Sequence, residues 1–144
     1  MLRGTYSHAL DPKGRIIIPA RLREELGESF VLSKGVEHCI SLYPPEAWEN
    51  FTEKLEHLPK ISSEPARRLR RFFYGNSMDA EIDKQGRLLI PQSLRSYAEL
   101  KKDVTLVGVE DHVEVWDTDL WNAYNSATEE DVDTLLYGME GVEI

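Results

Sequence analysis

The sequence has little cysteine, no long apolar run and, over residues 103–144, no lysine or arginine. The lone cysteine, Cys39, cannot form a disulfide within the chain, and we expect a small buried side chain rather than a nucleophile. No apolar run approaches the roughly 20 residues that cross a bilayer. The N-terminus, MLRGTYSHALDPKGR, lacks the apolar core of a signal peptide. These absences predict a cytoplasmic protein with no membrane segment.

The sequence also lacks the common signatures of catalysis. It has no glycine-rich phosphate loop, no G-x-S-x-G and no usable Ser-His-Asp order. The four histidines show no metal-ligand spacing with cysteine or with carboxylates; they are His8, His38, His57 and His112. We therefore expect no enzyme, no metal, no cofactor and no small-molecule substrate.

The net charge of −9 argues at first against a nucleic-acid partner, but the charge is unevenly distributed. Twelve of the 26 acidic residues lie in 103–144, which leaves 17 basic and 14 acidic residues in 1–102, a net charge of +3. Basic groups that share one face decide DNA binding, whatever the total charge. The acidity therefore belongs to the C-terminal part, and the total net charge does not exclude a nucleic-acid partner.

An internal repeat organises the chain. Residues 11–23, DPKGRIIIPARLR, match residues 83–95, DKQGRLLIPQSLR, at an offset of 72. The match resumes at an offset of 73, where GVEHCISLYPPEAW (35–48) aligns with GVEDHVEVWDTDLW (108–121). Two copies are too few for a solenoid. A paired, pseudo-twofold unit is the expected arrangement.

Both copies have the same expected order of elements: a strand, an Asp-x-x-Gly turn, a short strand, a short helix and a second strand pair. In the first copy the strands and helix are residues 6–10, 15–18, 20–26, 29–33 and 39–43. In the second copy they are residues 78–82, 87–90, 92–98, 103–107 and 113–116. Asp at the first and Gly at the fourth position favour type I turns, and we expect hairpins whose tips point outward. Pro19 and Pro91 are expected at the first position of the short helices.

One copy alone has too little apolar area for a stable core. Two copies that interleave their hairpins could close a small barrel, so we expect a mainly β fold with short helices (α+β) and one cooperative unit. The expected divisions are a first module at 4–48, a helical linker at 49–74, a second module at 75–121 and an acidic C-terminal helix and tail at 122–144. Helices are expected at 45–58 and 64–73, and a tail helix is expected to begin at an N-cap on Thr128.

The paired D-x-x-G-R-[IL]-x-I-P signatures resemble those of the MraZ family, whose halves are SpoVT-AbrB-type modules. The resemblance covers about residues 4–121 and includes Arg-Phe-Phe-Tyr at 71–74. It implies an intrachain swapped-hairpin β-barrel, several chains in a homo-oligomeric ring, and a regulator associated with the nucleoid. It further implies binding to repeated DNA boxes upstream of the regulator's own division and cell-wall gene cluster, most simply as a repressor. Arg15 and Arg87 are the DNA contacts that it implies.

Each of these residues also has a structural alternative. Arg15 and Arg87 could instead form ion pairs with Asp11 and Asp83, and both roles are compatible. We expect Asp11, Gly14, Asp83 and Gly86 to form the turns, because a carboxylate repels phosphate. Lys13, Lys84 and Arg3 are candidate phosphate contacts; their alternative is a solvated surface.

The remaining arginines have several possible partners. The face formed by Arg67, Arg70 and Arg71 could contact DNA, but we favour the acidic 103–144 segment of the same or a neighbouring chain. Arg21, Arg23 and Arg95 are expected to form surface or interface ion pairs. A rival function is an antitoxin-like protein-interaction module, although antitoxins usually carry one barrel half and a long disordered tail.

Overall fold

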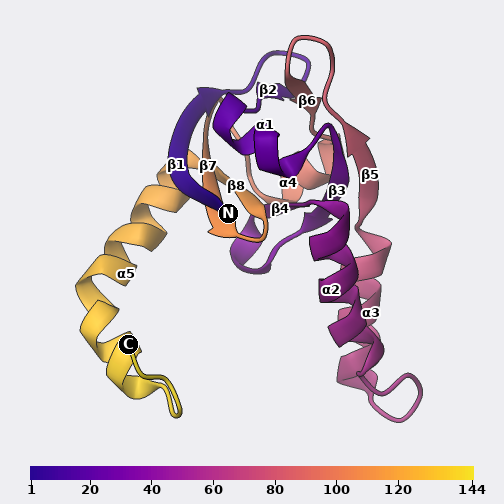
Figure 1. Ribbon diagram of the computed structural model, residues 1–144, viewed down its shortest axis with the longest axis vertical. Coiled ribbons are helices and arrows are strands. Elements are labelled where there is room, and N and C mark those ends of the chain that lie inside the picture. The colour runs from indigo at the N-terminus through magenta and orange to yellow at the C-terminus, as the bar shows by residue number, and fades with distance from the viewer.

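The computed structural model describes all residues from 1 to 144 (Figure 1). Its eight strands are β1 (Leu2–Ala9), β2 (Arg15–Ile17), β3 (Ser29–Lys34), β4 (Ile40–Tyr43), β5 (Met78–Glu81), β6 (Arg87–Leu89), β7 (Asp103–Glu110) and β8 (Val113–Asp117). Its α-helices are α1 (Ala20–Leu26), α2 (Pro45–Glu56), α3 (Glu64–Gly75), α4 (Gln92–Tyr97) and α5 (Thr118–Gly138), and a short 3-10 turn covers Val36–His38.

The strands form two antiparallel sheets, and most of their pairings join one copy of the repeat to the other. The larger sheet has the order β1-β7-β8-β4-β3-β5, and the smaller one pairs β2 with β6. Four of the six pairings cross between copies: β1 with β7, β2 with β6, β3 with β5 and β4 with β8. The mainly antiparallel α+β fold is therefore confirmed. The expected closed barrel is not observed, because β1 and β5 remain unpaired edges of an open sheet.

A single core of 17 buried residues draws on both copies. Ile16, Ile18 and Leu22 of the first copy are at most 1% exposed, as are their equivalents Leu88, Ile90 and Leu94. Each such side chain contributes about 1.5–3 kcal/mol when it is buried. Because one core holds residues of both copies, neither copy can bury its apolar strands alone.

The signature turns are not β-hairpins. The first strand begins earlier than residues 6–10, at Leu2, and its ladder partner is β7. Two backbone bonds close the turn between β1 and β2, from Asp11 N to Arg15 O (2.9 Å) and from Gly14 N to Asp11 O (2.9 Å), and β1 and β2 form no ladder with each other. The hairpin expectation was wrong because the ladder groups of β2 are taken by β6 of the other copy.

Three helix starts also differ from expectation. Pro19 and Pro91 occupy the N-cap positions of α1 and α4, one residue before the expected place. Helix α5 begins at Thr118, where the Asp117 carboxylate accepts a hydrogen bond from Leu120 N (3.1 Å). Thr128 lies inside α5 and donates to Tyr124 O (3.1 Å), so it is no N-cap. Asp is preferred over Thr as an N-cap, and Asp117 starts the helix before Thr128 is reached.

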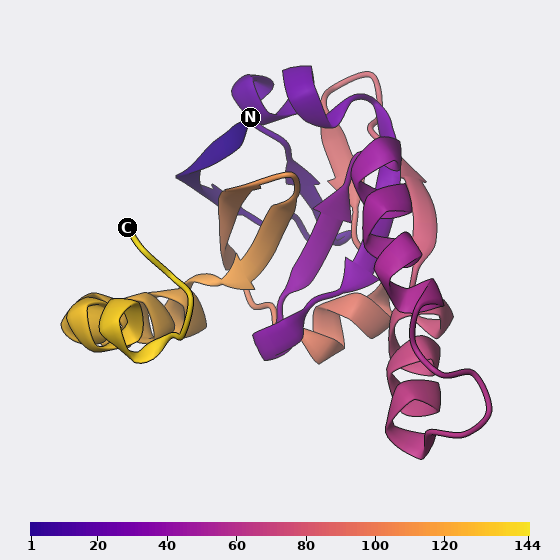
Figure 2. The same cartoon turned by 60° about the horizontal axis from the view of Figure 1, so that its bottom comes forward.

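The two long helical segments project from the sheets in different ways. Helices α2 and α3 run side by side as one projection, whereas α5 extends alone from the other side of the molecule (Figures 1 and 2). No residue of α5 is buried. None of the helices is both long enough and apolar enough to cross a membrane.

Candidate nucleic-acid interface

The first signature turn is organised by the side chain of Asp11. Its Oδ1 accepts hydrogen bonds from the backbone N–H of Lys13 (2.9 Å) and of Arg15 (2.8 Å). The turn closes through Gly14 N and Asp11 O (2.9 Å). Gly14 has φ of 85°, a conformation that side chains with a Cβ adopt only with strain. Asp11 and Gly14 therefore form the turn, as the sequence predicts.

The second signature turn repeats this geometry almost atom for atom. Asp83 Oδ1 accepts from Gln85 N (2.9 Å) and from Arg87 N (2.9 Å), and Gly86 N donates to Asp83 O (3.0 Å). Gly86 has φ of 78°. In the second turn Lys84 stands at the position of Pro12, and Gln85 stands at the position of Lys13. The geometry of the turn is the same in both copies.

Each turn aspartate also holds the arginine four residues later. Arg15 Nε lies 2.6 Å from Asp11 Oδ2, and Arg87 Nε lies 2.9 Å from Asp83 Oδ2. The backbone N–H of Arg15 and its guanidinium hold the pKa of Asp11 below its usual value, and Arg87 does the same for Asp83. The ion-pair alternative is thus correct. It uses only Nε, and the two terminal nitrogens of both arginines make no hydrogen bond in the chain. That end of the guanidinium remains available for a bidentate partner.

The two arginines lie on one face of the β2–β6 ribbon. Arg15 pairs with Leu89 and Arg87 pairs with Ile17, so the two arginine Cα atoms are diagonal neighbours roughly 8 Å apart. Side chains alternate across a strand, and Ile16 and Leu88 point into the core on the opposite face. The turns stand next to each other at one end of the molecule (Figure 1). The structure therefore joins the two signatures into a single surface.

This outer face carries two aliphatic residues that the sequence reasoning missed. Ile17 is 49% exposed and Leu89 is 58% exposed. Both sit inside runs of apolar residues, Ile-Ile-Ile and Leu-Leu-Ile, and such unbroken runs are typical of strands buried on both faces. Alternation with period two inside those runs was the signal that could have identified them.

Each turn is held by the opposite copy of the repeat. Gly14 O accepts from Ile90 N (2.9 Å), and Gly86 O accepts from Ile18 N (3.0 Å). The guanidinium of Arg95 lies over Gly14, where a Cβ would overlap it, and that of Arg23 lies 2.5 Å from the place of a Cβ on Gly86.

Arg21, Arg23 and Arg95 form no ion pair within the chain, and ion pairs of these residues with a neighbouring chain stay a prediction. Arg95 instead donates to Lys13 O (3.4 Å) and to Gln92 Oε1 (2.6 Å). Both arginines join the surface of the two turns, and the final Arg of the repeated LR pair was the overlooked signal.

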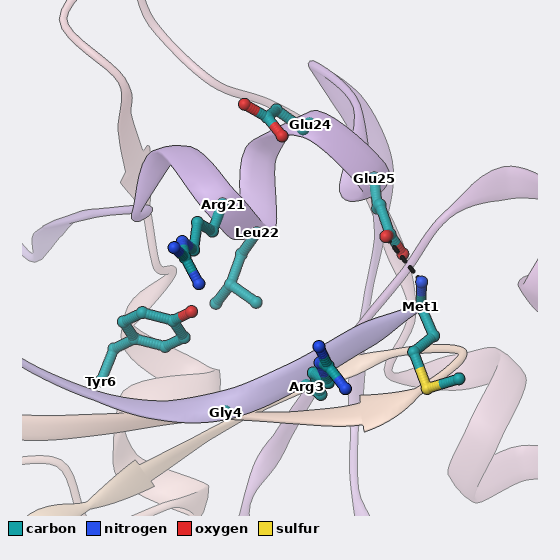
Figure 3. A pocket seen from close by; sticks show the side chains of 8 residues that line it. All are labelled: Met1, Arg3, Gly4, Tyr6, Arg21, Leu22, Glu24 and Glu25. Atoms are coloured by element: carbon teal, nitrogen blue, oxygen red, sulfur yellow. Dashed lines mark hydrogen bonds and ion pairs between the residues drawn. The ribbon is translucent and has the colours of Figure 1, made fainter.

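The other predicted contacts divide between two places. Lys13 and Lys84 are exposed on the turns beside the arginines. Arg3 lies near the far end of β1, roughly 20 Å of extended strand from the first turn. There it lines a separate cavity of about 390 Å³ together with Tyr6 and Arg21, which Figure 3 shows. The structure does not bring Arg3 to the turns.

The arginines of α3 find partners on their own helical projection. Arg70 lies 3.7 Å from Glu56 and donates to Leu55 O (3.2 Å), Arg68 lies 3.9 Å from Glu64, and Arg67 donates to Ile61 O. None of them pairs with residues 103–144 of the same chain. Pairing with the acidic segment of a neighbouring chain stays a prediction.

No cluster of three His, Cys, Asp or Glu side chains is arranged to hold a metal ion. Cys39 is fully buried, and this burial raises the pKa of its thiol. The prediction of a buried, unreactive cysteine therefore agrees with the structure.

Comparison with known proteins agrees with the doubled signature. The model of the family described as "MraZ protein, putative antitoxin-like" matches residues 1–72 and again residues 73–135. The chain belongs to the MraZ family. It is 44% identical to "Transcriptional regulator MraZ" of Thermoanaerobacter sp. (strain X514) over 144 residues, which cover all of both chains. It is 47% identical over 129 residues to the protein of the same name from Caldanaerobacter subterraneus subsp. tengcongensis, with 90% of each chain covered.

Among solved structures, the solution structure of PHS018 from Pyrococcus horikoshii is similar at a TM-score of 0.32 and 17% identity. That match covers 80% of this chain and 88% of PHS018.

Proposed function

We propose that the chain is a sequence-specific DNA-binding transcriptional regulator. Its proposed targets are repeated boxes upstream of its own division and cell-wall gene cluster, where it represses by covering the promoter. The MraZ relatives that carry the name of transcriptional regulators support the general class. The observation that carries the proposal is the outer face of the β2–β6 ribbon, where Arg15 and Arg87 keep their terminal nitrogens unpaired.

The geometry suits the major groove of double-stranded DNA. The groove admits a two-stranded β-ribbon, and a guanidinium fork matches the O6 and N7 acceptors of guanine. In this proposal Asp11 and Asp83 aim the arginines, and Ile17 and Leu89 contact thymine methyl groups. Lys13, Lys84, Arg23 and Arg95 supply phosphate contacts, which add affinity that depends on salt.

We further propose that several copies assemble into a ring. Leu120, Tyr124, Val132 and Leu135 fall on one face of α5 at helical spacing, and each is at least 36% exposed. Residues 103–144 are acidic and contain no lysine or arginine, whereas Arg68 and Arg71 are exposed on α3. A contact between α5 of one copy and α3 of the next would cover the apolar face and match opposite charges.

Each chain offers only a few contacts to DNA, and a ring would allow these few contacts to give tight binding. Several ribbons that engage repeated boxes together gain affinity through effective concentration. The variant Val132→Asp/Leu135→Asp, which changes only exposed positions, should yield monomers with weaker operator binding. Unchanged affinity in the monomeric variant would contradict the avidity argument.

The proposed architecture is an intrachain swap of strands between two modules, at 4–48 and 75–121, within an open sheet, with a linker at 49–74 and a tail at 122–144. The four strand pairings that cross between copies support it. A regulator of this kind would be cytoplasmic and associated with the nucleoid. The antitoxin-like alternative is not favoured, because the relatives are named as transcriptional regulators.

The deciding experiment is fluorescence-anisotropy binding to DNA from directly upstream of the gene, with scrambled DNA as the competitor, across a salt series. We expect Arg15→Ala/Arg87→Ala to lose selective binding by roughly 30-fold or more, since each base contact contributes about 1–3 kcal/mol. Lys54→Ala/Lys60→Ala, which removes two charges on the α2–α3 projection, is the matched control.

Three outcomes are informative. Selective binding that is lost only in the arginine pair supports the proposal. Selective binding that survives in the arginine pair would move the DNA surface elsewhere, to the arginines of α3 first. Absence of selective binding by the wild type at any salt concentration would refute the regulator function.

A further inference from the structure

A groove separates the first signature turn from helix α4 of the second module. It has a volume of about 310 Å³, and its polar lining includes Asp11, Gln92, Arg95 and Ser96. Gly14 forms part of the wall, and its missing side chain leaves the place that the Arg95 guanidinium occupies. The groove therefore exists only because two different modules meet at this turn.

The polar side chains of α4 form a chain of hydrogen bonds along this groove. Arg95 Nη2 donates to Gln92 Oε1 (2.6 Å), and Gln92 Nε2 donates to Ser96 Oγ (3.3 Å). The Ser96 hydroxyl keeps its own hydrogen for another acceptor. Arg95 has five N–H donors and uses two of them, neither on a carboxylate. The groove thus presents spare donors that are already held in position.

The only carboxylate that lines the groove is already satisfied. Asp11 Oδ1 accepts two backbone N–H groups, and Oδ2 accepts Arg15 Nε. Its charge is balanced locally by Arg15 at 2.6 Å. Lys13 is exposed on the adjoining turn. The ligand that fits these groups is therefore an anion with several oxygen acceptors, and a phosphodiester group is of this kind.

The equivalent place on the other side of the pseudo-twofold axis has different chemistry. There the second turn meets α1, and the repeat puts Ala20 at the position of Gln92 and Glu24 at the position of Ser96. Arg23 corresponds to Arg95 and lies over Gly86, but its guanidinium makes no hydrogen bond or ion pair in the chain. At α4, Arg95 is fixed by hydrogen bonds and is followed by Ser96, which carries a hydroxyl. At α1, Arg23 has no such hydrogen bonds and is followed by Glu24, which carries a carboxylate.

We propose that the groove between the first turn and α4 is a binding site for a DNA backbone phosphate, and that its counterpart at α1 is the weaker of the two. The inference rests on the proposed DNA-binding function and goes beyond it, because it makes the two ends of the ribbon unequal. A chain with one strong and one weak phosphate site would bind an asymmetric box in a preferred direction.

Two charge changes at exposed positions test this inequality. Ser96→Glu gives α4 the carboxylate of α1, and Glu24→Ser gives α1 the hydroxyl of α4. Ser93→Glu is the matched control, because it adds the same charge to an exposed position on the same helix outside the groove. Arg95→Gln and Arg23→Gln form a second matched pair. Binding to upstream DNA and to scrambled DNA is measured by anisotropy across a salt series, with circular dichroism melts to verify folding.

We expect Ser96→Glu to weaken binding about tenfold, to lower the salt slope by about one, and to exceed the effect of Ser93→Glu several-fold. Arg95→Gln should weaken binding more than Arg23→Gln, and Glu24→Ser should strengthen it a few-fold. Equal effects of Ser96→Glu and Ser93→Glu, or of the two arginine variants, would overturn the inference while the wild type still binds selectively. A wild type without selective binding would overturn the proposed function, and this inference with it.

Discussion

The two copies of the repeat form the same turn but leave their following helices in different surroundings. In the first copy Tyr43 stacks on Phe51 (5.5 Å between centroids), and Phe73 of α3 meets Phe51 edge-on (4.9 Å). In the second copy Trp116 meets Trp121 (5.4 Å) and Tyr124 (5.2 Å), and no helix of this chain covers them on the outer side. The first copy completes its aromatic cluster with a second helix of the same chain, whereas in the second copy Tyr124 stays 47% exposed, and a neighbouring chain is its proposed cover.

This difference separates what the repeat needs in order to fold from what each copy is free to change. The turn residues and the buried strand residues are shared because both copies contribute to one core and brace each other's turns. The helix surfaces diverge because they lie outside that core. Differences between equivalent positions therefore point to function and assembly more than to folding.

The largest expected effect is on the free energy of unfolding, and it tests whether both copies contribute equally to the core. Leu22→Ala and Leu94→Ala should each lower the free energy of unfolding by about 2–5 kcal/mol, because both side chains are 1% exposed in the same cluster. Urea denaturation followed by tryptophan fluorescence and circular dichroism should give one coincident transition for each variant. Two separate transitions, or a large effect in one copy only, would show that the copies fold independently.

A smaller effect should distinguish the two aromatic clusters. Phe51→Ala should reduce the stability of the monomer by about 2 kcal/mol, since Phe51 packs between Tyr43 and Phe73. Tyr124→Ala should reduce it by less than about 1 kcal/mol, because Tyr124 is 47% exposed. Sedimentation velocity should show the reverse order, with assembly weakened by Tyr124→Ala. Equal losses of monomer stability would contradict the comparison.

The repeat and its elements could be predicted from the sequence, but the partners of the strands could not. Alternating apolar residues and the Asp-x-x-Gly spacing locate the turns within the chain. Which strand accepts the ladder bonds of β2 depends on the other copy, 72 residues away, and a local pattern does not contain that information. This is why the hairpin expectation failed while the turn itself was correct.

The candidate site was partly predictable for the same reason. Arg15, Arg87 and their aspartates lie four residues apart, and the pairing follows from local geometry. Arg23 and Arg95 act on turns of the opposite copy, and only the folded chain brings them there. Arg3 had the right charge, but the length of β1 carries it to the far end of the strand.

A moderate loss of stability should follow when the two turn glycines are replaced by alanine. Gly14→Ala and Gly86→Ala should each destabilise the fold by about 1–3 kcal/mol, because both positions have positive φ and face a guanidinium. Gly14→Ala should have the larger effect, since its Cβ overlaps Arg95. Gly75→Ala is the control, with no heavy atom near its Cβ and no positive φ. Thermal melts check the order, and a loss in Gly75→Ala equal to that in Gly14→Ala would contradict it.

The smallest expected effect is a loss of stability at acid pH. The folded turns lower the pKa of Asp11 and Asp83 from about 3.8, first through the backbone N–H groups of Arg15 and Arg87. A carboxyl whose folded pKa is depressed adds stability that is fully present above its unfolded pKa and is lost as the pH falls through its folded pKa. The stability difference between the wild type and Asp83→Asn should therefore stay constant above about pH 5 and shrink below about pH 3.8. Carboxyl carbon NMR titrations should place both midpoints below 3.8. A midpoint at or above 3.8 for only one of the two aspartates would mean that the turns differ in solution, and the inequality between the modules would then begin at the turns rather than at the helices beside them.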